Sequence, residues 1–276
     1  MTFSIVGFDP KTKELGIATQ SKFLGVGAVV PWAVAGVGAV ATQSYANTSY
    51  GPNGLDLMAS GKSAQETLDI LTSNDDQREL RQAGIVDANG NSATFTGEKC
   101  YDWAGGIAGE NFAAQGNILV SEETVQAMAS TFQATEGTLA ERLLAALDAG
   151  QAAGGDSRGM QSAALLVVKE KGGYGGYNDR FIDLRVDDHP DPIKELIRIY
   201  QLQQLYFAPT KEENILDITG DVKEELTTHL QRLGYLIDDN LFKALTTYIH
   251  TENFEAREQA EGKIDRDILE YMKQQA

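Results

Sequence analysis

The feature that most constrains the fold is a series of short apolar runs at the start of the chain, rich in glycine, alanine and valine. One run spans Phe3–Phe8, a second occupies Leu15–Thr19 after a polar turn, and Gly25–Thr42 continues with small residues. Small side chains let neighbouring backbones approach closely, and continuous apolar runs are typical of strands buried on both faces. The sequence therefore predicts closely packed, buried strands rather than an exposed sheet.

A polar segment from Thr42 to Ser49 follows these strands directly. It places hydrogen-bonding groups at an edge of the predicted sheet, where functional sites are common. Two helices are expected next. A short one lies within Tyr50–Gly61, and another begins at Ser63, because Ser63 and Glu66 have the spacing of a capping box.

The pair Asn89-Gly90 lies between the apolar runs 85–87 and 92–96, which is a strong signal for a β-hairpin. The further elements expected are an irregular or edge segment at 100–109, a strand at 112–115, helices at 121–131 and from 138 to 154, and strands at 163–168 and 181–186. This order of strands and helices predicts an α+β fold in which sheets lie between helical layers.

Composition indicates a main domain and a smaller appendage, since 276 residues exceed one average domain. Residues 1–186 carry 13 basic and 21 acidic side chains, whereas residues 187–276 carry 10 and 19 and contain no glycine-rich strands. The segment Asp187–Pro192 marks this change. We therefore expect a main domain over residues 1–208, including a trailing helix, and a small helical domain over residues 209–276.

The net charge of −17 argues against nucleic acid and against an anionic membrane as partners, because both would be repelled. An uncharged or cationic ligand is easier to accommodate. The single cysteine, Cys100, cannot form an internal disulfide, and the N-terminus lacks the pattern of a signal peptide. A cytoplasmic location is therefore expected. No sequence pattern indicates a cofactor or a metal site, and self-association into a homo-oligomer stays open.

Thr2 is a candidate nucleophile, because removal of Met1 would place its hydroxyl beside a free α-amine. Such an amine has a reference pKa of about 7.7–8.0, so it can accept the hydroxyl proton near neutral pH. The alternative is that Thr2 is an ordinary first residue of an ordinary strand.

Several separated motifs resemble the N-terminal nucleophile (Ntn) hydrolase superfamily, including the Thr2 start, Ala18–Ser21 and Gly155–Ser162. The closer similarity is to the uncharacterised DUF1028 family and covers roughly residues 1–206. The motifs that carry it are Gly16–Ser21, Val30–Ala33, Gly36–Ser44, Tyr50–Pro52, Gly154–Ala164 and Asp187–Pro192.

The superfamily resemblance implies a four-layer αββα sandwich and hydrolysis of an amide or related bond. Thr2 would be nucleophile and base together, and the backbone N–H groups of Gln43 and Ser44 could form the oxyanion hole. Asp156 would hold the α-amine. The sequence departs from this pattern at Gln20, where related enzymes have an aspartate, and no lysine matches theirs, Lys22 being the nearest candidate.

Polar residues near these motifs are candidates for substrate contacts: Gln20, Ser21, Asn47, Asn117, Arg158, Gln161 and Ser162. Arg158 either binds a substrate carboxylate or pairs with Asp156 to fix the turn. Asparagines near glycine are also typical turn residues, and a serine that enters a buried strand often satisfies backbone groups.

The C-terminal segment predicts a helix at 193–206 followed by a small all-α domain with helices at 222–233, 241–249 and 264–272. Its Leu226, Leu230 and Leu233–Tyr235 resemble a small peptidoglycan-binding domain family. A three-helix interaction module with another partner is an equal alternative.

Together these features favour an Ntn-type hydrolase that acts on a small amide, peptide-like or ureido compound through an acyl-enzyme on Thr2. The alternative is a non-catalytic protein that binds a ligand or partner and uses its helical tail for docking. A cell-wall protein that binds peptidoglycan is a third hypothesis, and it depends on the tail alone.

Overall fold

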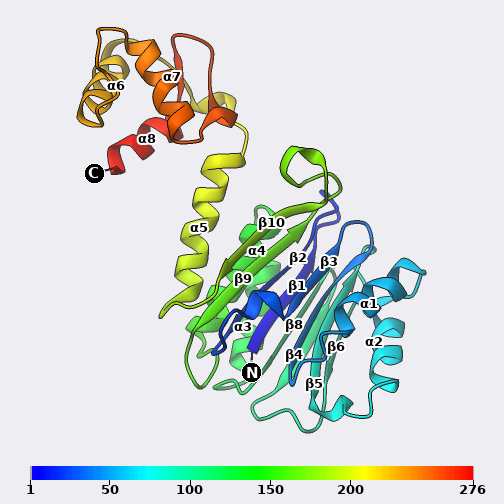
Figure 1. Ribbon diagram of the computed structural model, residues 1–276. Coiled ribbons are helices and arrows are strands. Elements are labelled where there is room, and N and C mark those ends of the chain that lie inside the picture. The colour runs from blue at the N-terminus through cyan, green and yellow to red at the C-terminus, as the bar shows by residue number, and fades with distance from the viewer. Residues whose placement is uncertain (1, 276) are drawn as a thin grey trace. The chain divides into compact units, whose positions relative to one another are not determined.

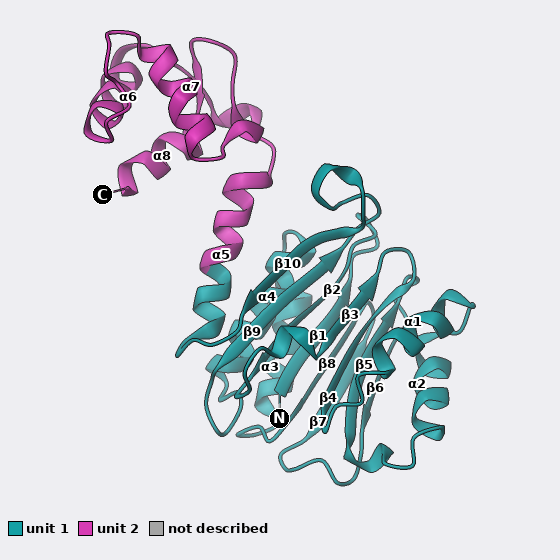
Figure 2. Cartoon of the chain, viewed as in Figure 1, with its two compact units in different colours: residues 1–197 teal, residues 198–276 magenta. Residues whose placement is uncertain are grey.

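The computed structural model describes residues 2–275, which form two compact units divided between Ile197 and Arg198 (Figure 2). Antiparallel sheets and eight α-helices occur in this part of the chain (Figure 1). The predicted α+β class is therefore confirmed. Within residues 2–275, no helix combines the length and apolar character needed to cross a membrane.

Unit 1 contains a six-stranded sheet in which every neighbouring pair of strands is antiparallel. In spatial order the strands are β10 (Arg180–Val186), β9 (Ser162–Val168), β2 (Leu15–Ser21), β1 (Thr2–Phe8), β8 (Phe112–Asn117) and β7 (Gly105–Gly109). Strand β1 lies inside the sheet between β2 and β8, and all its residues are buried. Thr2 therefore begins a central strand, and the burial of this strand is what the apolar runs predicted.

A second sheet of unit 1 has four strands, β3 (Pro31–Val34), β4 (Gly38–Ser44), β5 (Arg81–Asp87) and β6 (Ser92–Thr96). Strands β5 and β6 pair in antiparallel fashion on either side of Asn89-Gly90, and Gly90 has a φ of +85°. A positive φ is readily adopted by glycine, which explains why this dipeptide makes the turn. The predicted hairpin is confirmed.

The two sheets pack against each other through an apolar cluster that includes Val6 and Phe8 from the first sheet and Ala41 and Val86 from the second. One close approach requires a glycine: a Cβ atom on Gly84 would lie 1.9 Å from the side-chain oxygen of Gln115. The small residues of the sequence thus allow side chains of one sheet to reach the backbone of the other.

Two helices pack on each sheet. Helices α1 (Tyr50–Ala59) and α2 (Ala64–Ser73) contact the four-stranded sheet, and α3 (Glu123–Ala134) and α4 (Leu139–Ala152) contact the six-stranded sheet (Figure 1). Both predicted capping boxes are present, in α2 and in α4. They satisfy backbone N–H groups at the first turn of each helix, which fixes where these helices begin.

Helix α5 (Pro192–Phe207) crosses the boundary between the units. Unit 2 contains α6 (Gly220–Arg232), α7 (Leu241–Thr251) and α8 (Arg266–Gln274), packed around a core that includes Tyr248 and Phe254. It also contains a two-stranded antiparallel sheet of β11 (Ile215–Asp217) and β12 (Lys263–Asp265).

The small sheet departs from the all-α domain that the sequence predicted. Ile264, expected to open the last helix, lies in β12 and pairs with Leu216. The side chain of Asp265 accepts a hydrogen bond from the backbone N–H of Asp267, which caps α8 and makes the helix begin after the strand.

Candidate active site

A pocket of about 410 Å³ lies where strands β1, β2 and β4 bring Thr2, Ser21 and Gln43 together. This volume is within the range of small-molecule sites. The residues that line it are Thr2, Ser21, Lys22, Phe23, Val26, Val29, Val30, Gln43, Ser44, Tyr45, Ala46, Arg81 and Arg158. Five of the sequence-predicted site residues are therefore on its wall: Thr2, Ser21, Gln43, Ser44 and Arg158.

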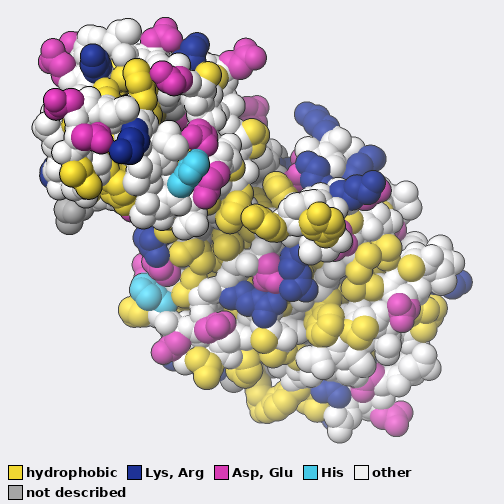
Figure 3. Space-filling model, turned by 45° about the horizontal axis from the view of Figure 1, so that its top comes forward, with side chains coloured by type: hydrophobic (Ala, Val, Ile, Leu, Met, Phe, Trp, Pro, Cys, Tyr) yellow, Lys and Arg dark blue, Asp and Glu magenta, His cyan; other side chains and the backbone are white. Residues whose placement is uncertain are grey.

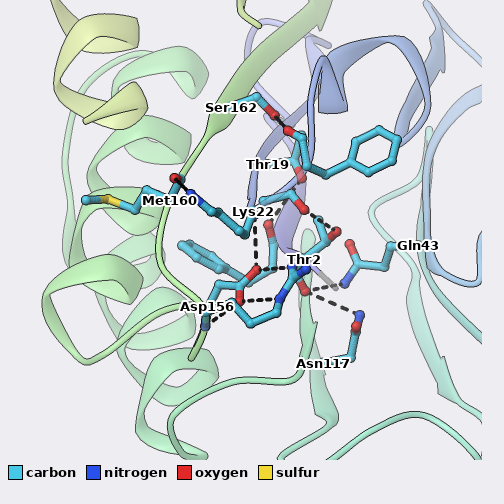
Figure 4. A network of polar contacts seen from close by, with 12 residues as sticks. Thr2, Thr19, Lys22, Gln43, Asn117, Asp156, Met160 and Ser162 are labelled. Atoms are coloured by element: carbon cyan, nitrogen blue, oxygen red, sulfur yellow. Dashed lines mark hydrogen bonds and ion pairs between the residues drawn. The ribbon is translucent and has the colours of Figure 1, made fainter. Parts of the chain in front are cut away.

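Thr2 is nearly buried, with 4% of its surface exposed, and its hydroxyl faces β2. Its Oγ1 donates a hydrogen bond to Oγ of Ser21 at 3.1 Å (Figure 4). Met1, whose removal would free the α-amine of Thr2, lies outside the described residues. The central strand thus brings two hydroxyl groups together on the pocket wall.

The carbonyl of Thr2 is held by amides from two other strands. Nε2 of Gln43 and Nδ2 of Asn117 donate to it at 3.2 and 3.4 Å (Figure 4). Both amides also donate to Oε1 of Gln82, each at 2.8 Å. All four residues are buried. Asn117 and Gln82 do not line the pocket, so they position Thr2 from behind.

Ser44 ends β4 with a φ of +71°, in the left-handed region that non-glycine residues adopt rarely. The chain leaves the sheet here, and both Ser44 and the following Tyr45 line the pocket. Such backbone outliers cluster at functional sites. The role of Gln43 and Ser44 as an oxyanion hole stays a prediction.

Asp156 is buried beneath the pocket wall, and its carboxylate holds two segments together. Oδ2 accepts a hydrogen bond from the backbone N–H of Lys22 at 3.1 Å, which fixes the end of β2 (Figure 4). The guanidinium of Arg158 pairs with both oxygens, at 3.0 Å from Nε to Oδ1 and 2.6 Å from Nη2 to Oδ2. Within residues 2–275, the carboxylate therefore contacts Lys22 and Arg158, not Thr2. Arg158 pairs with Asp156 and lines the pocket as well.

Gln161 and Ser162 have structural contacts rather than a place in the pocket. The backbone N–H of Gln161 donates to the carbonyl of Ser21 at 3.1 Å. Oγ of Ser162 donates to the carbonyl of Phe23 and accepts from the N–H of Val26. These bonds hold the segment after β2, which includes the short 3₁₀ helix Val26–Ala28. The two residues therefore support the pocket wall, and their contacts with a substrate stay a prediction.

Gln20 and Asn47 are also not on the pocket wall. Side chains alternate along a strand, so Gln20 lies on the face of β2 opposite to Ser21. It is fully buried there. Asn47 donates to the carboxylate of Asp75 at 3.1 Å and accepts from Ser49, as a turn residue would.

Arg81 also lines the pocket, although it was not among the site residues predicted from the sequence. Its Nε donates to Oδ2 of Asp75 at 2.9 Å, and its Nη1 donates to the carbonyl of Tyr45 at 2.6 Å. Arg81 thereby fixes the backbone just after Ser44. Hydrogen bonds from Arg81, and also from Asn47, hold the pKa of Asp75 well below its usual range. No motif or spacing in the sequence signals this cluster.

Replacing Asp75 with asparagine is expected to lower the stability of unit 1 by about 1–3 kcal/mol at pH 7, because Arg81 loses a charged partner. Since the folded-state pKa of Asp75 is lowered, its stabilisation is complete above the unfolded-state pKa of about 3.9 and is lost as pH falls further. The variant should therefore lose less stability than the native protein upon acidification from about pH 5 to pH 3. Urea unfolding followed by tryptophan fluorescence measures this, since both tryptophans, Trp32 and Trp103, lie in unit 1.

The neighbouring, exposed Asp76 provides the control for this prediction. Asp76→Asn should match the native protein in both stability and acid sensitivity. An Asp75→Asn variant with the same acid sensitivity as the native protein would contradict the role given to the ion pair.

Comparisons with known proteins place this site in an uncharacterised family. A family model described as "Family of unknown function (DUF1028)" matches residues 2–196. The crystal structure of protein SPO2555 from Silicibacter pomeroyi, described as DUF1028, is similar with 32% identity and a TM-score of 0.67, covering 81% of this chain and 92% of that chain. A model described as "Putative peptidoglycan binding domain" matches residues 206–272. No curated protein matches.

Proposed function

This chain belongs to the DUF1028 family, whose function is unknown, and we propose that it is an Ntn-type hydrolase. It cleaves an amide or related C–N bond of a small molecule or peptide-like compound, with Thr2 as the nucleophile. The two packed sheets, each contacted by a pair of helices, support a four-layer αββα sandwich of the Ntn class.

The observation that carries the proposal is the position of Thr2. It begins a central strand of the sheet, it lines a pocket of small-molecule size together with Ser21, and its carbonyl is held by two buried amides. A buried carbonyl needs a hydrogen-bond partner in any strand, so the distinguishing feature is the place of Thr2 on the pocket wall. The amides that hold its carbonyl also fix its position, which a nucleophile requires to within about 0.5 Å.

In the proposed reaction, removal of Met1 gives Thr2 a free α-amine. The amine takes the proton of the hydroxyl as Oγ1 attacks the substrate carbonyl carbon. The C–N bond then breaks, the proton passes to the leaving nitrogen, and an ester to Thr2 remains. A water molecule, deprotonated by the same amine, hydrolyses the ester and restores the hydroxyl.

Neighbouring residues have supporting roles in this proposal. Ser21 orients the hydroxyl of Thr2 through the 3.1 Å hydrogen bond. The backbone N–H groups of Gln43 and Ser44 stabilise the oxyanion. The left-handed conformation of Ser44 is what brings these N–H groups to the pocket in this proposal. Asp156 contributes negative charge near the α-amine while its pairing with Arg158 keeps the turn in place.

The first test is the intact mass of the native protein. The proposal predicts that Met1 is absent, so that the chain begins at Thr2. Complete retention of Met1 in protein that reacts with an acylating probe would remove the mechanism.

A second candidate function rests on the family match over residues 206–272. Here the protein binds peptidoglycan through unit 2, and unit 1 binds a ligand without catalysis. Sedimentation of the chain with purified peptidoglycan tests the binding by unit 2. Cell fractionation tests the cytoplasmic location that is expected from the sequence. Failure to sediment above the level of an unrelated acidic protein would dismiss this candidate.

A further inference from the structure

The charge of the pocket differs from that of the chain as a whole. The protein carries a net charge of −17, and on the face drawn in Figure 3 acidic side chains lie among basic ones. The residues that line the pocket include Lys22, Arg81 and Arg158, and among these described lining residues none is an aspartate or glutamate. Basic side chains are therefore concentrated where Thr2 is placed.

Two of these three charges are already balanced by a carboxylate. Arg81 pairs with Asp75 and Arg158 pairs with Asp156, at 2.9 and 2.6 Å. Lys22 is different, because its Nζ donates to a neutral group, the backbone carbonyl of Met160, at 3.1 Å (Figure 4). Within residues 2–275, no carboxylate lies within ion-pair distance of this ammonium. The pocket thus retains one positive charge.

The position of Lys22 is fixed by the site itself. It directly follows Ser21, the partner of the Thr2 hydroxyl, and its backbone N–H donates to Asp156. Lys22 lines the pocket, so its ammonium would have to exchange the Met160 carbonyl for a group of a compound whose carbonyl lies at Thr2. An ion pair between Lys22 and a bound anion is little affected by the distant acidic surface of the protein, because charges more than about 8–10 Å apart are screened at physiological salt.

One part of the wall is apolar. Val26, Val29 and Val30 line it, and Phe23 is half exposed at the same pocket. Burial of an apolar part of a ligand against these side chains is favourable in free energy. None of these side chains can pair with a second charged group of the ligand. The complement of this pocket is a compound with an apolar portion and a single anionic group.

We infer that the pocket takes a monoanionic acyl compound, with a carboxylate paired to Lys22 and an apolar portion against the three valines. This inference rests on the proposed function, and names its substrate class. It replaces the expectation of an uncharged or cationic ligand, which net charge alone had favoured, because the local charge of the pocket has the opposite sign.

The test uses two β-lactones of equal size, one with a carboxylate and one with a carboxamide at the same position. Acylation of the native protein is followed by intact mass. The carboxylate probe should react about two- to fivefold faster, the ratio expected of an ion pair with an exposed ammonium. In Lys22→Met this ratio should fall to about 1, and added salt should reduce it in the native protein.

Lys11→Met is the matched control, since it removes the same charge from the β1–β2 turn, roughly 20 Å away along β2. It should keep the native ratio. A carboxamide probe that reacts as fast as the carboxylate probe, or a preference that persists in Lys22→Met, would overturn the inference while leaving the hydrolase proposal standing.

Binding of phenylacetate and phenylacetamide to Thr2→Ala, measured by ligand-observed NMR, separates the two proposals. Preference for phenylacetate that is lost in Thr2→Ala/Lys22→Met supports the anionic site even if neither β-lactone acylates the native protein. Equal or stronger binding of phenylacetamide would contradict the anionic site, whatever the β-lactones do.

Discussion

Replacing Thr2 with alanine is expected to abolish acylation by a β-lactone, with a fall in rate of at least roughly 10³-fold, because the attacking oxygen is removed. Thr2→Ser keeps the oxygen and should retain labelling. The methyl group of threonine restricts rotation about χ1, so the serine variant should react more slowly than the native protein. Time courses of intact mass for the three proteins measure these rates.

Two further hydroxyl variants show whether the effect belongs to the site. Ser21→Ala removes the hydrogen-bond partner of Thr2 and should slow labelling by about tenfold, the usual effect of one hydrogen bond of about 1.4 kcal/mol. Thr12→Ala removes a hydroxyl from the distant β1–β2 turn and should change nothing. Labelling of Thr2→Ala at the native rate would place the nucleophile elsewhere.

The second large effect is expected from Gln82, although this residue does not line the pocket. Gln82→Leu removes the oxygen that accepts hydrogen bonds from Gln43 and Asn117, the two amides that hold the carbonyl of Thr2. Two buried donors would lose a partner, at about 1–3 kcal/mol each. We expect a loss of stability of about 3 kcal/mol, and labelling at least tenfold slower, because a displacement of about 1 Å at a nucleophile can cost 10²-fold.

Thr96→Val is the control for Gln82. Oγ1 of Thr96 accepts from Nε2 of Gln82, which also donates to the carbonyl of Gly116, so the network towards Thr2 is preserved. This variant should lose some stability and keep nearly native labelling. A Gln82→Leu protein that is destabilised but labelled at the native rate would show that the amide network supports the fold without positioning Thr2.

Much of the secondary structure could be predicted because its signals are local. Ser63 and Glu66 lie within one helical turn, and Asn89-Gly90 requires only a tight turn between two apolar runs. The sheet in unit 2 could not be predicted in this way. Ile264 suits a helix and a strand equally, and its pairing with Leu216 joins segments far apart in the chain.

Part of the pocket lining could be predicted, since Thr2, Ser21, Gln43, Ser44 and Arg158 meet at one pocket. Gln20 and Ser21 are adjacent in sequence, and only strand alternation decides which of them faces Thr2.

The rest of the site depends on contacts between strands that the sequence does not reveal. Gln82 meets Gln43 on the neighbouring strand of its own sheet and Asn117 in the other sheet, and Arg81 reaches Asp75 across a loop. No sequence motif marks Gln82 or Arg81, because a buried glutamine and an arginine at the start of a strand both occur in many structural roles.

The central claim is that Thr2, as the first residue of the mature chain, forms the acyl-enzyme. The most direct measurement is peptide mass mapping of native protein labelled with the carboxylate β-lactone. We expect the adduct on the N-terminal peptide, on Thr2, with Met1 absent. An adduct on any other residue, or on a peptide that still carries Met1, would contradict the claim.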